Sequence, residues 1–241
     1  MSNEATTLNE ELIKEMANAG VIYGHKKTKT HPRMKPYIGG ARNEIEFIEP
    51  EASFSSLEKA VEFMKEKLRG GGLALLLGTA PAAKNAILAF ADEFKYPYVV
   101  RRWLGGTLTN FKVINQRLNY YLDLRAKKES GELIKYTKKE QHLFTEKINK
   151  LSQFFEGLIN LKRLPDLLFI VDVETHATAV REARRLKIPI VAILDTDDDP
   201  ALVDYPIFAN DHARLSIEWV VEKIKKALAT VDLKSGNNDL E

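Results

Sequence analysis

A run of aspartates follows one of the most apolar segments of the chain. Asp195, Asp197, Asp198 and Asp199 come directly after Ile190–Leu194. If that segment is a parallel strand, these carboxylates lie at the sheet edge where α/β proteins bind ligands. Carboxylates in such a cluster hold Mg²⁺ or accept a phosphoryl group. One alternative is therefore a Mg²⁺-dependent phosphatase or phosphotransferase that uses Asp195 and Asp197.

The surroundings of the aspartates leave two other interpretations open. Asp172 and His176 follow another apolar run, so an acidic pocket with a structural cation is one of them. The other is that the aspartates cap helices and solvate the turn before Pro200. Because the nearby loops carry no basic residue at a recognisable spacing, we expect no catalytic residue and no enzyme. The 5 histidines show no paired ligand spacing and the chain has no cysteine, so we predict no metal site.

Two long stretches contain no Asp or Glu and are rich in groups that bind an anionic backbone. They are Met16–Asn43 and Phe94–Leu122. Arginine and lysine contact phosphates, while hydroxyl and amide groups contact sugars and base edges. The sequence therefore predicts RNA binding by Lys26, Lys27, Lys29, Arg33, Lys35, Arg42, Arg101, Arg102, Thr107, Thr109, Asn110 and Lys112.

The second stretch contains a tryptophan and a glycine pair whose roles stay open at this point. Trp103 either packs in the core or stacks on an unpaired base. Gly105 and Gly106 either make the loop flexible near RNA or only let the chain leave the sheet. Arg101 and Arg102 have no acid nearby in the sequence, which favours an anionic ligand.

The motifs that cradle phosphates in nucleotide-binding enzymes are missing. The turn after Leu73–Leu77 is Gly78-Thr79-Ala80-Pro81-Ala82-Ala83, without the further glycines of a dinucleotide fingerprint or the Gly-Lys-Ser/Thr of a P-loop. The triplet Gly70–Gly72 precedes that run and lies at the wrong end of a strand. We expect no cofactor and no small-molecule substrate.

Short apolar runs alternate with amphipathic stretches along most of the chain. The runs typical of strands are Ile45–Ile48, Leu73–Leu77, Tyr98–Val100, Leu167–Val171, Ile190–Leu194 and Ile207–Phe208, and the helical stretches are Phe54–Leu68, Pro81–Phe94, Thr175–Leu186 and His212–Ala229. Several strand runs are apolar at every position, as in parallel strands covered on both faces. The pattern predicts an α/β fold with a mostly parallel sheet flanked by helices, a flavodoxin-like or Rossmann-like three-layer arrangement.

The segment 111–161 breaks this alternation. Phe111, Ile114 and Leu118 are spaced by three and four residues, and a series from Phe144 to Leu158 has the same spacing. That is the period, about 3.5 residues, of helices packed as a coiled coil. We predict an inserted coiled-coil hairpin with a turn at Ser130-Gly131 and a capping box at Thr137 and Glu140; two ordinary surface helices are the alternative.

The insertion makes the main domain discontinuous. We predict an α/β domain from residues 9–110 and 162–230, the hairpin at 111–161, and flexible tails at 1–8 and 231–241, which are polar and lack periodicity. The lysines near the hairpin tip belong either to a solvated helix face or to the RNA surface.

Charge is unevenly distributed along the chain. Residues 1–165 hold 27 basic and 19 acidic groups, a net charge of +8, and residues 166–241 hold 9 and 15, a net charge of −6. This predicts an RNA-facing side and an acidic side that faces solvent or a basic partner protein. No apolar run reaches the roughly 20 residues of a membrane helix, and the start shows no signal pattern, so we expect a cytoplasmic protein without membrane contact.

Several strings resemble protein two of the bacterial small ribosomal subunit. Leu12–His25 is similar to that family's amino-terminal signature, and His31–Ile38 to its next block. Arg102–Phe111, which reads Arg-Trp-Leu-Gly-Gly-Thr-Leu-Thr-Asn-Phe, resembles its most recognisable string. Leu161–Asp166 and Ile188–Thr196 resemble its carboxyl half. The blocks follow the family's order along nearly the whole chain.

The resemblance implies an α/β domain with a coiled-coil hairpin and a structural role in the small ribosomal subunit. It implies binding to small-subunit rRNA, to small-subunit protein one and to other ribosomal proteins, and a need for the protein in subunit assembly and translation. It also implies no catalysis and no required cofactor. The chain departs from the family at Ala80–Ala83, where lysines are usual, and at His176, where an acid is usual. A protein-interaction adaptor that acts through the hairpin is a further alternative.

Overall fold

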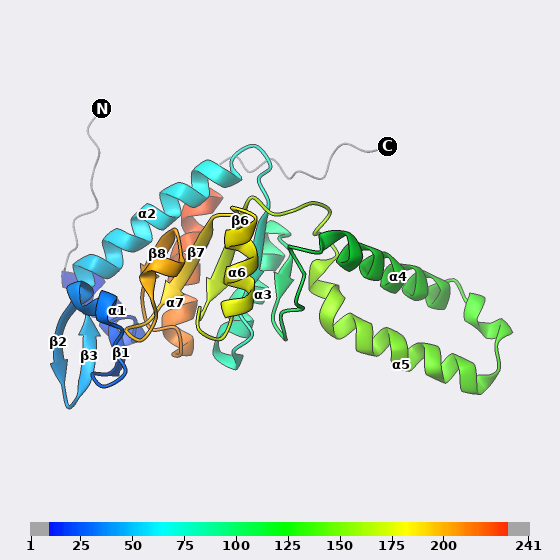
Figure 1. Ribbon diagram of the computed structural model, residues 1–241, viewed down its shortest axis with the longest axis horizontal. Helices are drawn as coiled ribbons and strands as arrows, with labels where there is room; N and C mark the ends of the chain where they lie inside the picture. The colour runs from blue at the N-terminus through cyan, green and yellow to red at the C-terminus, as the bar shows by residue number, and fades with distance from the viewer. Residues whose placement is uncertain (1–9, 231–241) are drawn as a thin grey trace.

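The computed structural model describes residues 10–230, and the predicted flexible tails at 1–8 and 231–241 lie outside this range. Figure 1 shows a central sheet with helices on both faces, a small second sheet at one end and two long helices that extend from the other. None of the helices within the described range has the length and apolar character needed to cross a bilayer.

The central sheet has five parallel strands in the order β5-β4-β6-β7-β8. They are β4 (Ala74–Leu77), β5 (Tyr98–Val99), β6 (Leu167–Val171), β7 (Ile190–Leu194) and β8 (Tyr205–Phe208). Every residue of β4, β6 and β7 is buried, as expected for parallel strands covered on both faces. The predicted three-layer α/β fold is confirmed.

Alternate side chains of these strands enter two cores, one on each face of the sheet. Leu76 and Phe169 belong to the first core, while Leu75 and Leu168 belong to the second. The helices over the first core are α2 (Pro50–Leu68), α3 (Pro81–Phe94) and α7 (Arg214–Ala229), and α6 (Ala177–Arg185) covers the second. The predicted helices are thus present, although α2 begins before Phe54 because Pro50 suits the first turn of a helix.

A second, antiparallel sheet lies beside the β8 end of the central sheet (Figure 1). Its strands are β1 (Tyr23–Lys26), β3 (Ile45–Ile48) and β2 (Ile38–Arg42), in that order, next to α1 (Glu10–Ala19) and the 3-10 helix η1 (Pro32–Tyr37). Of these elements the sequence indicated only β3, and it placed β3 in the central sheet. Helix α1 was not predicted. Strands β1 and β2 were missed because they are short and carry glycines and basic residues instead of an apolar run.

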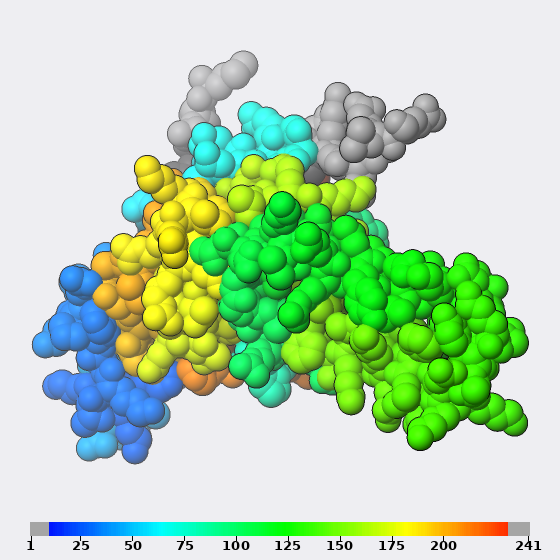
Figure 2. All heavy atoms as spheres, turned by 45° about the vertical axis from the view of Figure 1, so that its right-hand side comes forward, coloured from blue at the N-terminus to red at the C-terminus, as the bar shows by residue number. Residues whose placement is uncertain are grey.

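Two long helices, α4 (Phe111–Glu129) and α5 (Lys138–Phe155), project from the β5 end (Figures 1 and 2). Between them the chain turns at Gly131, whose φ is +77°, and through the 3-10 helix η2 (Glu132–Lys135). The predicted capping box is present, with Thr137 N donating to Glu140 Oε2 at 2.9 Å. The coiled-coil character of this hairpin and the domain boundaries at 110 and 162 stay predictions.

The hairpin returns to the sheet at Gly157, in the 3-10 helix η3 (Glu156–Leu158). A Cβ atom at Gly157 would lie 2.3 Å from Tyr98 O and 2.8 Å from Tyr98 Cδ2. We therefore expect Gly157→Ala to force η3 away from β5 and to lower the free energy of unfolding, measured by urea denaturation, by about 2 kcal/mol.

Gly40→Ala in β2 is the matched control for this prediction. A Cβ at Gly40 meets no other described part of the chain within 4 Å, so its effect should stay within about 0.5 kcal/mol. Equal losses in the two variants would contradict the steric explanation.

Candidate nucleic-acid interface

One buried carboxylate organises the loop between β5 and α4. Glu182 of α6 is 8% exposed. Its Oε1 accepts hydrogen bonds from Trp103 Nε1 at 3.0 Å and Gly106 N at 2.8 Å. Its Oε2 accepts from Leu108 N at 3.0 Å, Thr109 N at 3.1 Å and Thr109 Oγ1 at 3.0 Å. Five donors of the loop therefore converge on a single side chain.

The hydrogen bonds keep this carboxylate charged. Burial raises the pKa of Glu182, but the hydrogen bonds from Trp103 and the loop amides outweigh burial and leave the pKa below its usual range. Glu182 is not among the residues predicted from the sequence. A signal was available, because Glu182 lies on the face of α6 that also carries the buried Ala179 and Ala183.

The loop buries two residues that were candidates for contact with RNA. Trp103 is 9% exposed and packs in the core on the α6 side of the sheet, so the core alternative is confirmed. Thr107 is 1% exposed, and its hydroxyl donates to Leu104 O at 2.6 Å. Thr107 therefore offers almost no surface to a ligand, and its predicted role is untested.

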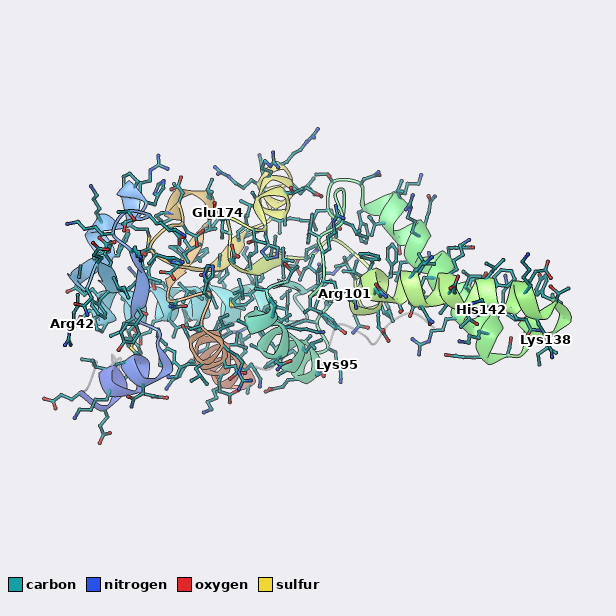
Figure 3. The ribbon with its side chains drawn as sticks, turned by 90° about the horizontal axis from the view of Figure 1, so that it is seen from below. Arg42, Lys95, Arg101, Lys138, His142 and Glu174 are labelled. Carbon is teal, nitrogen blue, oxygen red and sulfur yellow. The ribbon has the colours of Figure 1, made fainter. Side chains whose placement is uncertain are left out.

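The exposed part of the loop is basic. Arg101, Arg102, Thr109, Asn110 and Lys112 are exposed. Arg101 Nη1 donates to Gln153 Oε1 of α5 at 2.6 Å, which orients this guanidinium at the root of the hairpin (Figure 3). Helix α4 begins after Asn110 without a side-chain cap, so its positive dipole end adds to the local charge. In Figure 2 this surface lies between α6 and the hairpin.

The other predicted residues gather on the small sheet and the turns beside it. Those that are exposed are Lys26, Lys27, Lys29, Arg33, Lys35 and Arg42. Arg33 differs from the rest because its Nη1 lies 2.7 Å from Asp199 Oδ2. This ion pair partly neutralises the charge of Arg33, so the neighbouring lysines and Arg42 contribute more of the positive charge of this surface.

The structure does not bring the two basic groups together. The loop 100–110 follows β5 at one edge of the central sheet, and the small sheet packs beside β8 at the other edge. Figure 3 shows Arg42 and Arg101 far apart along the molecule, with Lys138 beyond them on the hairpin. The predicted residues therefore form two surfaces, and a single ligand that touches both must be long enough to span the sheet.

A cluster of acids and histidines lies between the two sheets. His25 Nδ1 of β1 is 3.1 Å from Asp195 Oδ2 and 3.3 Å from Asp197 Oδ1. One potential ligand atom each from His25, Asp195 and His212 lies within 4.8 Å of the others. Imidazole nitrogens with a carboxylate oxygen can hold a divalent metal ion. No spacing pattern predicted this set, because its members are joined by the fold alone.

The protonation of this cluster follows from its burial. Burial raises the pKa of Asp198 and of Asp211. Repulsion from Asp211 adds to the rise at Asp198, and repulsion from Asp195 adds to the rise at Asp211. The hydrogen bond from His212 Nδ1 to Asp211 Oδ1, at 2.5 Å, raises the pKa of His212 to about 9. Asp199 differs from these groups, because its Oδ1 accepts from Ala201 N at 3.0 Å and caps the 3-10 helix η4 (Pro200–Leu202). The capping interpretation is confirmed for Asp199.

Side chains occupy the point where α/β sheets bind nucleotides. The strand order reverses between β4 and β6, which is the usual ligand crevice of such sheets. There Thr79 Oγ1 lies 3.0 Å from His176 Nε2, and His176 Nδ1 lies 2.6 Å from Asp172 O. His176 is 3% exposed. This pair of side chains therefore lies at the carboxyl ends of β4 and β6, with His176 buried between them.

Comparison with known proteins assigns nearly the whole chain to one family. A family model described as Ribosomal protein S2 matches residues 16–230. The chain is 40% identical over 231 residues to small ribosomal subunit protein uS2 of Dictyoglomus thermophilum, which covers 95% of this chain and 94% of the relative. It is 40% identical over 214 residues to the same protein of Thermus thermophilus, and the match covers 89% of this chain and 84% of the relative. It is 38% identical over 216 residues to the same protein of Coprothermobacter proteolyticus, and that match covers 90% of this chain and 81% of the relative.

The loop geometry predicts that Glu182→Gln is severely destabilising. The new amide group presents N–H donors where an acceptor is needed, so loop amides are left unpaired in a buried place. We expect a loss of about 3 kcal/mol or more in the free energy of unfolding, measured by urea denaturation. Glu174→Gln makes the same change at an exposed position and should cost no more than about 0.5 kcal/mol.

The lowered pKa of Glu182 also predicts how this loss depends on pH. A carboxyl with a depressed folded-state pKa contributes fully above its unfolded pKa, and that contribution is lost as pH falls through the folded-state value. The stability difference between the wild type and Glu182→Gln should therefore be largest at neutral pH and shrink as the pH falls through the lowered folded-state pKa of Glu182. A difference that stays constant over this range would contradict the role of the ionised carboxylate.

Proposed function

Because the chain belongs to the ribosomal protein S2 family, whose members are structural proteins of the small ribosomal subunit, we propose that it binds small-subunit rRNA and neighbouring ribosomal proteins there. In this role it is needed for subunit assembly and for translation. The family is not one of enzymes, so the Mg²⁺-dependent phosphatase alternative is set aside.

The observation that carries the proposal is the exposed arginine pair at the start of a loop held by Glu182. Arg101 and Arg102 are exposed, and five hydrogen bonds to one carboxylate hold the residues that follow them. A loop ordered before binding loses little conformational entropy when it meets its ligand. Guanidinium groups presented in this way suit the phosphates and splayed bases of a folded RNA.

The other surfaces extend the same proposal. The lysines of the small sheet serve as a second phosphate contact, and the hairpin at 111–161 serves as an arm that reaches beyond the α/β domain of residues 9–110 and 162–230. The acidic carboxyl-terminal part of the chain suits basic neighbours. Contact with small-subunit protein one and a place in cytoplasmic ribosomes complete the proposal.

Salt dependence tests whether phosphate contacts dominate the binding. If about six phosphates are neutralised, the logarithm of affinity for a small-subunit rRNA fragment should fall with the logarithm of salt concentration at a slope of about −4 to −5. Filter binding of the purified chain over a range of KCl concentrations measures this slope. A flat response would rule out an electrostatic RNA interface.

Charge reversal tests the loop itself. Arg101→Glu with Arg102→Glu should weaken RNA binding about tenfold or more and reduce incorporation into small subunits on sucrose gradients. The melting temperature of the free protein should stay nearly unchanged, because both side chains are exposed.

Arg184→Glu with Arg185→Glu is the matched control, since this exposed pair lies in the last turn of α6 and outside the proposed contacts. Incorporation of the control variant should match the wild type. If both pairs reduce incorporation equally, or if the first pair lowers the melting temperature strongly, the loop does not have the proposed role.

A further inference from the structure

A groove separate from both basic surfaces runs between α2 and the edge strand β8. Its volume is about 610 Å³. Two stacked aromatic pairs form its floor. The rings of Phe63 and Tyr205 are 3.8 Å apart with an interplanar angle of 13°, and those of Tyr37 and Phe208 are 4.0 Å apart at 27°. A groove with this floor can hold several side chains of a partner.

The edge of β8 beside the groove cannot be extended by another strand. Pro206 has no N–H to donate, and Phe208 N already donates to Ser56 Oγ of α2 at 3.1 Å. Edge strands closed in this way do not pair with a further strand. An occupant of the groove must therefore bind through its side chains.

The rim of the groove is acidic. Glu62 and Glu66 line it from successive turns of α2. Asp204 lines it from the residue before β8, where its Oδ2 also accepts from Ile190 N at 2.8 Å. Lys59 is the single cation among its lining residues. Neither Glu62 nor Glu66 makes an ion pair within residues 10–230. Like charges four residues apart disfavour a helix, so a cationic occupant would relieve their repulsion.

The aromatic floor also suits a cation. Lys67 Nζ of this chain lies 5.8 Å from the centroid of the Phe63 ring. An arginine is better suited than a lysine to such a floor, because its planar guanidinium stacks on a ring while its N–H groups bind carboxylates.

We propose that the groove between α2 and β8 binds a basic, extended segment of another protein, with an arginine laid on the Phe63–Tyr205 pair and held by Glu62, Glu66 and Asp204. RNA is the wrong partner for this groove, because its phosphates would face three carboxylates. One groove of this size makes a weak contact by itself, and it contributes within a larger assembly by raising the effective concentration of the partner. The proposal does not depend on the RNA contacts.

The test uses the purified full chain and short fluorescent Gly/Ser peptides that carry arginines, lysines or glutamates at the same positions. Fluorescence anisotropy should rank arginine above lysine by about threefold and detect no binding of the glutamate peptide. Glu62→Gln with Glu66→Gln should weaken the arginine peptide about fivefold. Tyr205→Leu should remove the preference for arginine over lysine.

Glu51→Gln with Glu58→Gln is the matched control, because it removes the same charge from exposed positions of α2 outside the groove. It should change the peptide affinity less than about twofold. Neither glutamate pair should change the affinity for rRNA, so a failure of the groove and a failure of the RNA interface are distinguishable.

Four results would overturn the proposal. The first is the absence of arginine-peptide binding at about millimolar concentration, and the second is an equal effect of the groove and control variants. The third is self-association in sedimentation velocity that Glu62→Gln with Glu66→Gln alters, which would assign the groove to a second copy of the chain. Displacement of the peptide by RNA at the groove would likewise assign it to RNA.

Discussion

The buried carboxylate of Glu182 controls how the sheet connects to the hairpin. Removing a carboxylate from water costs several kcal/mol, and its full set of hydrogen bonds offsets that cost. Because those donors all belong to residues 103–109, the loop has one conformation in which they converge. The backbone that joins Arg101 and Arg102 to α4 is held by this interaction, while Gln153 of α5 orients the Arg101 guanidinium. The loop part of the proposed RNA interface thus depends on an acid of α6.

The order of the strands separates surfaces that the charge pattern grouped together. The excess of +8 in residues 1–165 suggested one basic side. With β5 at one edge of the sheet and β8 at the other, the basic residues divide between two ends of the molecule. The acidic groove mixes the two parts of the chain in turn, since Glu62 and Glu66 belong to the basic part and Asp204 to the acidic part. The uneven charge along the sequence therefore does not correspond to one basic face and one acidic face of the folded chain.

Most of the central fold could be predicted because its signals are local. Uninterrupted apolar runs at Leu73–Leu77, Leu167–Val171 and Ile190–Leu194 require strands buried on both faces, and amphipathic stretches between them require helices over that sheet. The small sheet could not be predicted in this way. Strands β1 and β2 are short and partly exposed, and they form because they pair with β3. Two backbone hydrogen bonds connect this part of the chain to the loops of the central sheet, from His31 N to Thr196 O and from Asn210 N to Val21 O.

Periodicity and composition alone predicted the fold class, two long helices between residues 111 and 161 and the residue types suited to RNA, because both are properties of neighbouring residues. The fold alone establishes that Thr107 and Trp103 are buried, that Glu182 holds the loop, and that His25, Asp195 and His212 meet. Each of these depends on residues far apart in the chain. Their contact is set by the order of the strands and by the need of buried polar groups for partners, and no local pattern records either.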